Sequence, residues 1–125
     1  MDAQDLLRTL QRLPDYVDEE GAARFWRLGD FNGGMAWLAR FSGESPWERH
    51  PDGDELLHVL EGEVQVVLLD EDGPLRARVR AGSVFVVPRG VWHRQIAAGT
   101  VVQWGATMGR TEHSDETDPL RAVEP

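Results

Sequence analysis

Residues 82–93 read GSVFVVPRGVWH, and this stretch decides the fold because a strand, a rigid turn and a histidine follow one another in it. The apolar run SVFVV predicts a buried strand. Gly82 before the run, and Pro88 and Gly90 after it, are turn-shaping residues, since proline fixes φ and glycine adopts conformations that other residues avoid. His93 then begins the returning strand, so a polar imidazole is placed at the start of a strand pair.

Short strands and glycine-rich turns continue on both sides of this stretch. Turn signals such as FNGG, PDGD, DEDGP and AAGT separate apolar or alternating segments. Many short strands with such turns are typical of a β-sandwich or small barrel, so we predict an all-β fold. The predicted strands are residues 24–28, 35–41, 55–60, 63–69, 76–80, 83–87, 93–96 and 101–104.

The chain length of 125 residues suits one domain with a single core. Residues 1–23 are predicted to form an N-terminal arm, in which residues 3–13 show leucines at the spacing of a short helix. Residues 24–108 form the predicted barrel. Residues 109–125 have few apolar side chains and many charges, which predicts a flexible polar tail.

The composition excludes several kinds of chemistry. The sequence has no cysteine, so disulfides, thiolate ligands and cysteine nucleophiles are absent. All 13 basic residues are arginines, which rules out a Schiff-base lysine. A formal net charge of -9 disfavours binding to nucleic acid or to anionic membranes. Because the first residues are acidic and no run of about 18 apolar residues occurs, we expect a cytoplasmic protein.

Residues 47–64, WERHPDGDELLHVLEGEV, gather polar side chains just before an apolar strand. Glu48 and His50 are two positions apart, so an extended chain points both side chains the same way. After the tight PDGD turn, Glu55 opens the next strand and returns beside His50. Alternation from Glu55 sends His58 to the opposite face, which predicts a packing or hydrogen-bonding role for His58 instead of metal ligation.

The stretch at residues 82–93 resembles the second signature motif of the cupin superfamily, whose members are double-stranded β-helix barrels. Gly82, Pro88, Gly90 and His93 match that motif with the spacing of the family throughout. The terminal asparagine of the motif is replaced by Ala97.

The stretch at residues 47–64 resembles the first cupin motif in part. From His50 onward the spacing is kept, with Glu55 and then Gly62 at the positions of the family pattern. Upstream the sequence departs from it, because Glu48 stands where the first histidine is expected and Gly43 lies one residue too close. Two motifs at the right separation identify the chain as a cupin-like barrel with a short N-terminal helix.

The resemblance implies a divalent metal ion inside the barrel, held by His50, Glu55 and His93, with Glu48 as a fourth ligand or as a general base. Such mixed imidazole and carboxylate ligands suit Fe, Mn, Ni, Zn or Co. The expected function is that of an enzyme acting on a small organic molecule, as a dioxygenase, isomerase, cyclase or decarboxylase. Because Glu48 replaces a histidine, the alternatives are a non-catalytic binding or sensor cupin with a degenerate metal site, or a structural barrel.

Three further residues are candidate substrate contacts. Gln95 follows His93 by two positions, so it shares the same strand face. Trp47 and Trp92 each directly precede a site residue and are placed to wall the mouth of a pocket. Aromatic side chains also serve as core residues, and that alternative stays open for both tryptophans.

Two expectations concern the surface. His113 lies in the predicted polar tail, so we expect it to be solvated and without a functional role. Cupin barrels commonly pair, and the outward strand face of Leu56, His58 and Leu60 is suitable for contacts in a homodimer. We therefore expect a homodimer that binds a small-molecule ligand.

Overall fold

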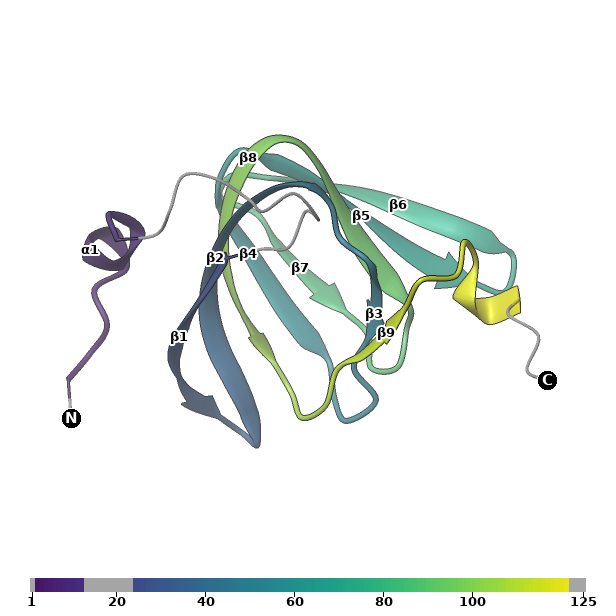
Figure 1. Ribbon diagram of the computed structural model, residues 1–125, viewed down its shortest axis with the longest axis horizontal. Coiled ribbons are helices and arrows are strands. Elements are labelled where there is room, and N and C mark those ends of the chain that lie inside the picture. The colour runs from purple at the N-terminus through teal and green to yellow at the C-terminus, as the bar shows by residue number, and fades with distance from the viewer. Residues whose placement is uncertain (1, 13–23, 122–125) are drawn as a thin grey trace.

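The computed structural model describes residues 2–12 and 24–121, whose strands curl into a barrel (Figure 1). This confirms the predicted all-β double-stranded β-helix with a short N-terminal helix. In chain order the elements are α1 (Leu6–Leu10), β1 (Arg24–Phe31), β2 (Gly34–Glu44), β3 (Trp47–Arg49), β4 (Glu55–Glu61), β5 (Glu63–Asp70), β6 (Gly73–Arg80), β7 (Val84–Val87), β8 (His93–Thr107), β9 (Glu112–Ser114) and the 3₁₀ helix η1 (Pro119–Arg121).

Strand β8 connects the parts of the barrel, because it pairs antiparallel with four other strands. Strands β2 and β3 lie along one edge of β8, and β5 and β4 lie along the other. Trp104, for example, is opposite Leu38 of β2 and His58 of β4. The N-terminal half of β8 pairs with β5 and the C-terminal half with β4, so the strand passes from one side of the barrel to the other.

The sequence predicts two strands separated by a turn at residues 97–100, but the structure has one continuous strand there. The 15 residues of β8 run through that segment without a break in the strand. A register shift in β2 between Phe41 and Gly43, opposite this segment, accommodates a local bend. The AAGT sequence thus marks the position where a long strand changes partners, as strands do at the corners of barrels.

Side chains alternate along β4 as the sequence predicted. Glu55, Leu57 and Val59 are buried, whereas Leu56 and His58 on the outer face are partly exposed. Leu57 and Val59 join an interior cluster of apolar side chains from five other strands. Its members are Trp37, Ala39, Phe41, Leu57, Val59, Val64, Val66, Val79, Val87, Ala97 and Val101.

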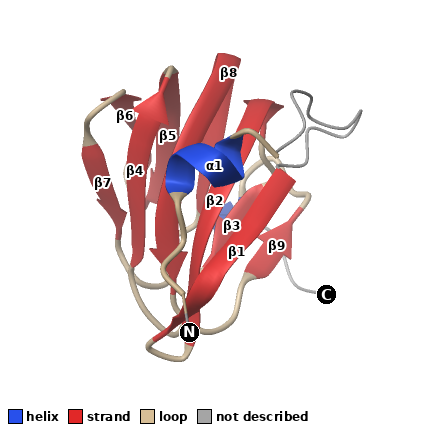
Figure 2. Ribbon diagram, turned by 90° about the vertical axis from the view of Figure 1, so that its left-hand side faces the viewer, coloured by secondary structure: helices blue, strands red, loops and turns tan. Residues whose placement is uncertain are grey.

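Helix α1 lies across the outside of the barrel (Figure 2). The Asp5 side chain caps its N-terminus by accepting a hydrogen bond from the backbone N–H of Arg8, at 3.0 Å. Leu10 anchors the helix by packing on Leu38 and Val102. The described helix is shorter than the predicted residues 3–13, and residues 13–23 of the predicted N-terminal arm lie outside the described residues.

Two remaining predictions concern the polar tail and the outer face of β4. Residues 112–114, which lie in the predicted polar tail, form β9 and pair with β3. The outer face of β4 carries Leu56, His58 and Leu60, and Nδ1 of His58 accepts a hydrogen bond from Nε1 of Trp104, at 2.8 Å. Pairing of two chains through this face stays a prediction. Among the described residues, no helix is both long and apolar enough to cross a membrane.

The crossing of β8 with its neighbours requires a glycine at position 105. A Cβ atom there would collide with the backbone carbonyl oxygen of Leu56 and lie 2.8 Å from Cζ2 of Trp37. We therefore expect Gly105→Ala to lower the free energy of unfolding by about 1–3 kcal/mol, as overpacking of a closed interior does. Urea denaturation measures this change through the transition midpoint.

Gly29→Ala is the matched control. A Cβ at Gly29 would have no neighbour within 4 Å, and its backbone is not in the left-handed region. We expect the same urea midpoint as for the unsubstituted protein, or a slightly higher one. Equal stability of the two variants would contradict the close approach at Gly105.

Candidate metal centre

The two loops that carry the motif residues are tied to each other. The backbone N–H of Arg89 donates to Oδ1 of Asp54 at 2.8 Å, and its Nε donates to the carbonyl oxygen of Pro51 at 2.7 Å. The backbone N–H of Gly90 donates to the carbonyl oxygen of His50 at 3.0 Å. The PDGD turn and the PRG turn are thereby fixed relative to each other, and with them the side chains that follow.

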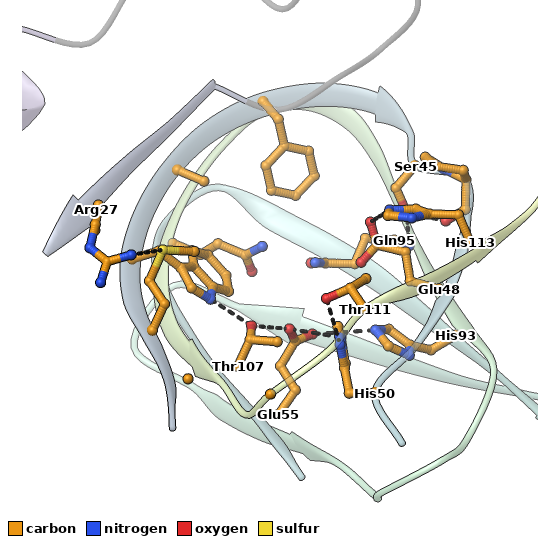
Figure 3. A pocket seen from close by; sticks show the side chains of 18 of the residues that line it. Arg27, Ser45, Glu48, His50, Glu55, His93, Gln95, Thr107, Thr111 and His113 are labelled. Carbon is orange, nitrogen blue, oxygen red and sulfur yellow. Dashed lines mark hydrogen bonds and ion pairs between the residues drawn. The ribbon is translucent and has the colours of Figure 1, made fainter. Parts of the chain in front are cut away.

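Glu55 contacts two imidazole rings, those of His50 and His93 (Figure 3). Its Oε2 is 3.0 Å from Nε2 of His50, and its Oε1 is 3.3 Å from Nε2 of His93. All three residues are buried, with exposed fractions of 3% for His50, 5% for Glu55 and 2% for His93. The structure therefore brings together the three residues that the motifs singled out.

Glu48 completes the cluster from β3. One carboxylate oxygen of Glu48 and one nitrogen each of His50 and His93 lie within 4.8 Å of one another. Glu48 and His93 are direct neighbours across the β3–β8 pair, which brings them to the same face of the sheet. Glu48, which stands where the cupin pattern has its first histidine, therefore still points into the site.

Each imidazole ring is held on its far side through Nδ1, so that Nε2 is the nitrogen directed at Glu55 and at a prospective ion. Nδ1 of His93 is 3.0 Å from the carbonyl oxygen of Val91. Because a carbonyl only accepts, Nδ1 carries the proton and Nε2 of the neutral ring keeps its lone pair. Nδ1 of His50 contacts Oγ1 of Thr111 at 3.1 Å, and its buried Nε2 has no well-aligned hydrogen-bond partner among the described atoms.

The buried carboxyl groups of Glu48 and Glu55 favour positive charge in the site. Burial would raise the pKa of Glu55, but contacts with His50 and His93 hold it at about 2, so this carboxylate stays ionised. Burial and the charge of Glu55 together raise the pKa of Glu48 above its ordinary value of 4.5. Burial opposes charging of His50, yet the contact with Glu55 prevails and raises its pKa above 6.5. Protons on the imidazoles or a bound metal cation can supply this positive charge.

A chain of hydrogen bonds orients the Glu55 carboxylate. Nε1 of Trp37 donates to Oγ1 of Thr107 at 2.8 Å, and the Thr107 hydroxyl donates to Oε2 of Glu55 at 2.5 Å. Glu55 and Thr107 face each other across the β4–β8 pair. Bonds of this kind hold a carboxylate ligand in place and tune its affinity for an ion.

His113 is a further candidate site residue, which sequence reasoning missed. It lies opposite Glu48 in the β3–β9 pair, and its Nε2 is 3.2 Å from Oε1 of Glu48. The His113 side chain is 57% exposed but lines the same cavity as Glu48. The side chain is thus largely exposed, as expected, and its contact with Glu48 adds a candidate role that the sequence did not indicate. No local sequence signal marks β9, because it pairs with residues more than 60 positions away.

A cavity of about 700 Å³ adjoins the cluster. Glu48, His50, Glu55 and His93 form part of its lining, and β2 contributes an apolar wall. The wall consists of Met35, Trp37, Ala39 and Phe41. This volume lies within the range of about 300–1,000 Å³ that is common for small-molecule sites.

Strand alternation places one of the three predicted substrate contacts in the cavity and directs the other two away from it. Gln95 lines the cavity, on the same strand face as His93. Trp47 and Trp92 do not line it; they are buried against Val67 in a separate cluster. Because each tryptophan directly precedes an inward-pointing residue, its own side chain is directed to the other face. Their burial matches the alternative of a packing role.

The donor set fits a divalent metal ion. Two imidazole nitrogens and a fixed carboxylate converge, a second carboxylate lies nearby, and one of the nitrogens is buried without an aligned partner. First-row divalent ions bind such mixed nitrogen and oxygen ligands.

The chain belongs to the cupin family, since the family model for the Cupin domain matches residues 40–116. A curated relative, the uncharacterized protein YdbB of Bacillus subtilis (strain 168), is 37% identical over 88 residues, which are 70% of this chain and 74% of the relative. The fold is similar to that of a cupin-2 domain containing protein from Shewanella frigidimarina, with 22% identity, coverage of 89% of this chain and 94% of that chain, and a TM-score of 0.65.

A second similar structure is an oxalate oxidase in complex with the substrate analogue glycolate. It is 21% identical, and the match covers 90% of this chain and 59% of that chain with a TM-score of 0.62. These comparisons confirm the resemblance that the two motifs indicated.

The hydroxyl of Thr107 provides a direct test of how Glu55 is held. We expect Thr107→Val, which keeps the shape but removes the hydroxyl, to lower the affinity for Zn(II) about 10- to 100-fold, because Glu55 loses its orienting bond. Isothermal titration calorimetry measures the affinity. Thr107→Ser keeps the hydroxyl and should retain most of it. An unchanged affinity in Thr107→Val would show that the bond to Glu55 is dispensable.

Proposed function

We propose that the protein binds one divalent transition-metal ion through His50, Glu55 and His93 and acts on a small organic molecule in the adjoining cavity. The observation that carries this proposal is the convergence of two Nε2 atoms on an ionised carboxylate at a cavity wall. Leaving such groups buried without a cation is costly, because the lone pairs and the carboxylate repel one another. The candidate ions are Fe, Mn, Ni, Zn and Co.

Glu48 is the residue with two possible uses in this site. Its carboxylate is near enough to His50 and His93 to share an ion with them. Its raised pKa also suits a group that accepts and returns a proton, and the contact with His113 holds one of its oxygens in place. We propose that Glu48 is the general base if the ion is held by the other three residues, and the fourth ligand otherwise.

A bound divalent ion supplies a Lewis acid that polarises an oxygen atom of the substrate. The protein contributes the remaining elements of catalysis. The apolar wall of β2 excludes water from one side of the substrate, and the carboxylate of Glu55 stays ionised at all physiological pH values. These features suit the reactions expected for this family, namely dioxygenation, isomerisation, cyclisation or decarboxylation. The glycolate complex of the similar oxalate oxidase supports a small organic molecule as the occupant.

The alternative function is a binding or sensor module without catalysis. The observation that favours it is Glu48 at the position where the family pattern has a histidine. In that case the cavity would hold a small molecule, but the ion would be absent. Metal content separates the two proposals.

The first experiment measures metal in protein purified without an affinity tag. We expect close to one transition-metal ion per chain by elemental analysis, and loss of that ion in His50→Ala and in His93→Ala. His58→Gln is the matched control, since His58 lies on the outer face of β4 and should leave the metal content unchanged. Persistent absence of metal after reconstitution would instead favour the binding module.

The pH dependence of metal binding follows from the contact between His50 and Glu55. The pKa of His50 is raised above 6.5, so its ring becomes protonated, and stops being a ligand, at a higher pH than an ordinary histidine. We expect affinity for Zn(II) to be constant at alkaline pH and to begin falling above pH 6.5 as the pH is lowered. The pKa of Glu55 is about 2, so Glu55 contributes nothing in this range. Calorimetric titrations between about pH 5.5 and 8.5 test this, and an onset below 6.5 would contradict it.

A further inference from the structure

Two glutamine side chains line the same cavity as the proposed metal ligands, one of them fully buried and the other partly buried. Gln95 and Gln103 both lie on β8 and both line the cavity. The Oε1 atom of each is buried and has no hydrogen-bond partner among the described protein atoms. Gln103 is only 2% exposed. Nothing in the proposed metal chemistry uses either residue.

The surroundings of Gln103 make its polar side chain unexpected. Its neighbours in the adjacent strands are Ala39 of β2 and Val59 of β4, and both are fully buried. A buried amide without a partner loses its hydration and gains nothing in return, so an apolar side chain of the same size would stabilise this position better. Natural proteins retain such costly groups chiefly where a site uses them.

The cavity therefore has three chemically different parts. The proposed ligands His50, Glu55 and His93 form one, the apolar wall of β2 forms the second, and the two amides of β8 form the third. An amide offers one acceptor oxygen and two donor hydrogens, so each glutamine can bind a hydroxyl or a carbonyl group. A ligand that satisfies all three parts needs an oxygen for the ion, an apolar body and a second polar group.

We infer that Gln95 and Gln103 are specificity-determining residues, which bind a hydroxyl or carbonyl group of a small substrate whose apolar body lies along β2. This inference rests on the proposed function in one respect, namely that one end of the substrate binds the metal ion. It adds the class of molecule: a small compound with an apolar skeleton that is oxygenated at two separate positions. Sites built to hydrogen-bond such a group reject analogues that lack it, because the buried amides are then left unpaired.

Stability gives the first test, on the ligand-free protein. We expect Gln103→Met, which keeps the side-chain length, to leave the melting temperature unchanged or raise it, because Oε1 of Gln103 has no hydrogen-bond partner among the described atoms. Gln65→Met is the control for loss of a bonded glutamine, since Oε1 of Gln65 accepts a hydrogen bond from Nη1 of Arg76 at 2.8 Å outside the cavity. A fall of more than about 4 °C in Gln103→Met would show that Gln103 has a structural role and would overturn the inference.

Binding gives the second test, with benzoate, 3-hydroxybenzoate and 4-hydroxybenzoate as probes. The carboxylate provides an oxygen for the ion, the ring suits the apolar wall, and the added hydroxyl is too far from the carboxylate to share the ion. Calorimetry is done on Zn(II)-loaded protein, because zinc is redox-inert. We expect at least one hydroxybenzoate to bind about tenfold more tightly than benzoate, as one satisfied buried hydrogen bond gives.

The variants assign that preference to the amides. Gln103→Met or Gln95→Met should abolish the preference for the hydroxyl while keeping the affinity for benzoate, and Gln65→Met should keep the preference. The inference is overturned if neither hydroxybenzoate exceeds benzoate, or if the preference survives in both cavity variants.

Parallel titrations separate this inference from the proposed function. If the protein fails to bind Zn(II) but shows a glutamine-dependent preference in its metal-free form, the proposed metal site is wrong and the amide site stands. If it binds Zn(II) and shows no preference, the amide site is wrong and the metal site stands. Binding of neither zinc nor any probe overturns both.

Discussion

The pairing of β8 along both of its edges is the constraint on which the rest of the structure depends. One strand of 15 residues is held by β2 and β3 on one edge and by β5 and β4 on the other, so its side chains cannot rotate between the two faces. Its inner face carries His93, Gln95, Gln103 and Thr107. A proposed metal ligand, the two amides that line the cavity and the residue that orients Glu55 therefore come from one rigid segment. Rigid elements position site residues more accurately than loops.

The centre of the site is the carboxylate of Glu55. It is ionised, buried, bonded by Thr107 and flanked by two imidazoles, each of which is fixed on its far side by an oxygen atom. Such fixed geometry reduces the entropy lost when an ion or a substrate binds. The same burial that strengthens these contacts also makes an uncompensated charge expensive, which is why the arrangement favours a bound cation.

Glu48 distinguishes this chain from the general cupin pattern, and its surroundings explain how it is accommodated. It is placed in the middle of a row of three strands, with His93 on one side and His113 on the other. A carboxylate here adds negative charge beside Glu55, and the two flanking histidines lower the cost of that charge. The C-terminal strand β9 is thus part of the site, and the short β3 connects it to the barrel.

The sequence by itself determined the fold class, the positions of His50, Glu55 and His93, and the outward direction of His58, because motif spacing and the two-residue period of a strand are local properties. Tertiary structure alone decided the rest. In the folded chain the segment around the AAGT sequence is part of one continuous strand, so Gln103 lies on the same face as His93. Tertiary structure also brought His113 to Glu48 through pairing with β9. These outcomes depend on which distant strands become neighbours, and strand pairing of that kind leaves no trace in the local pattern of either partner.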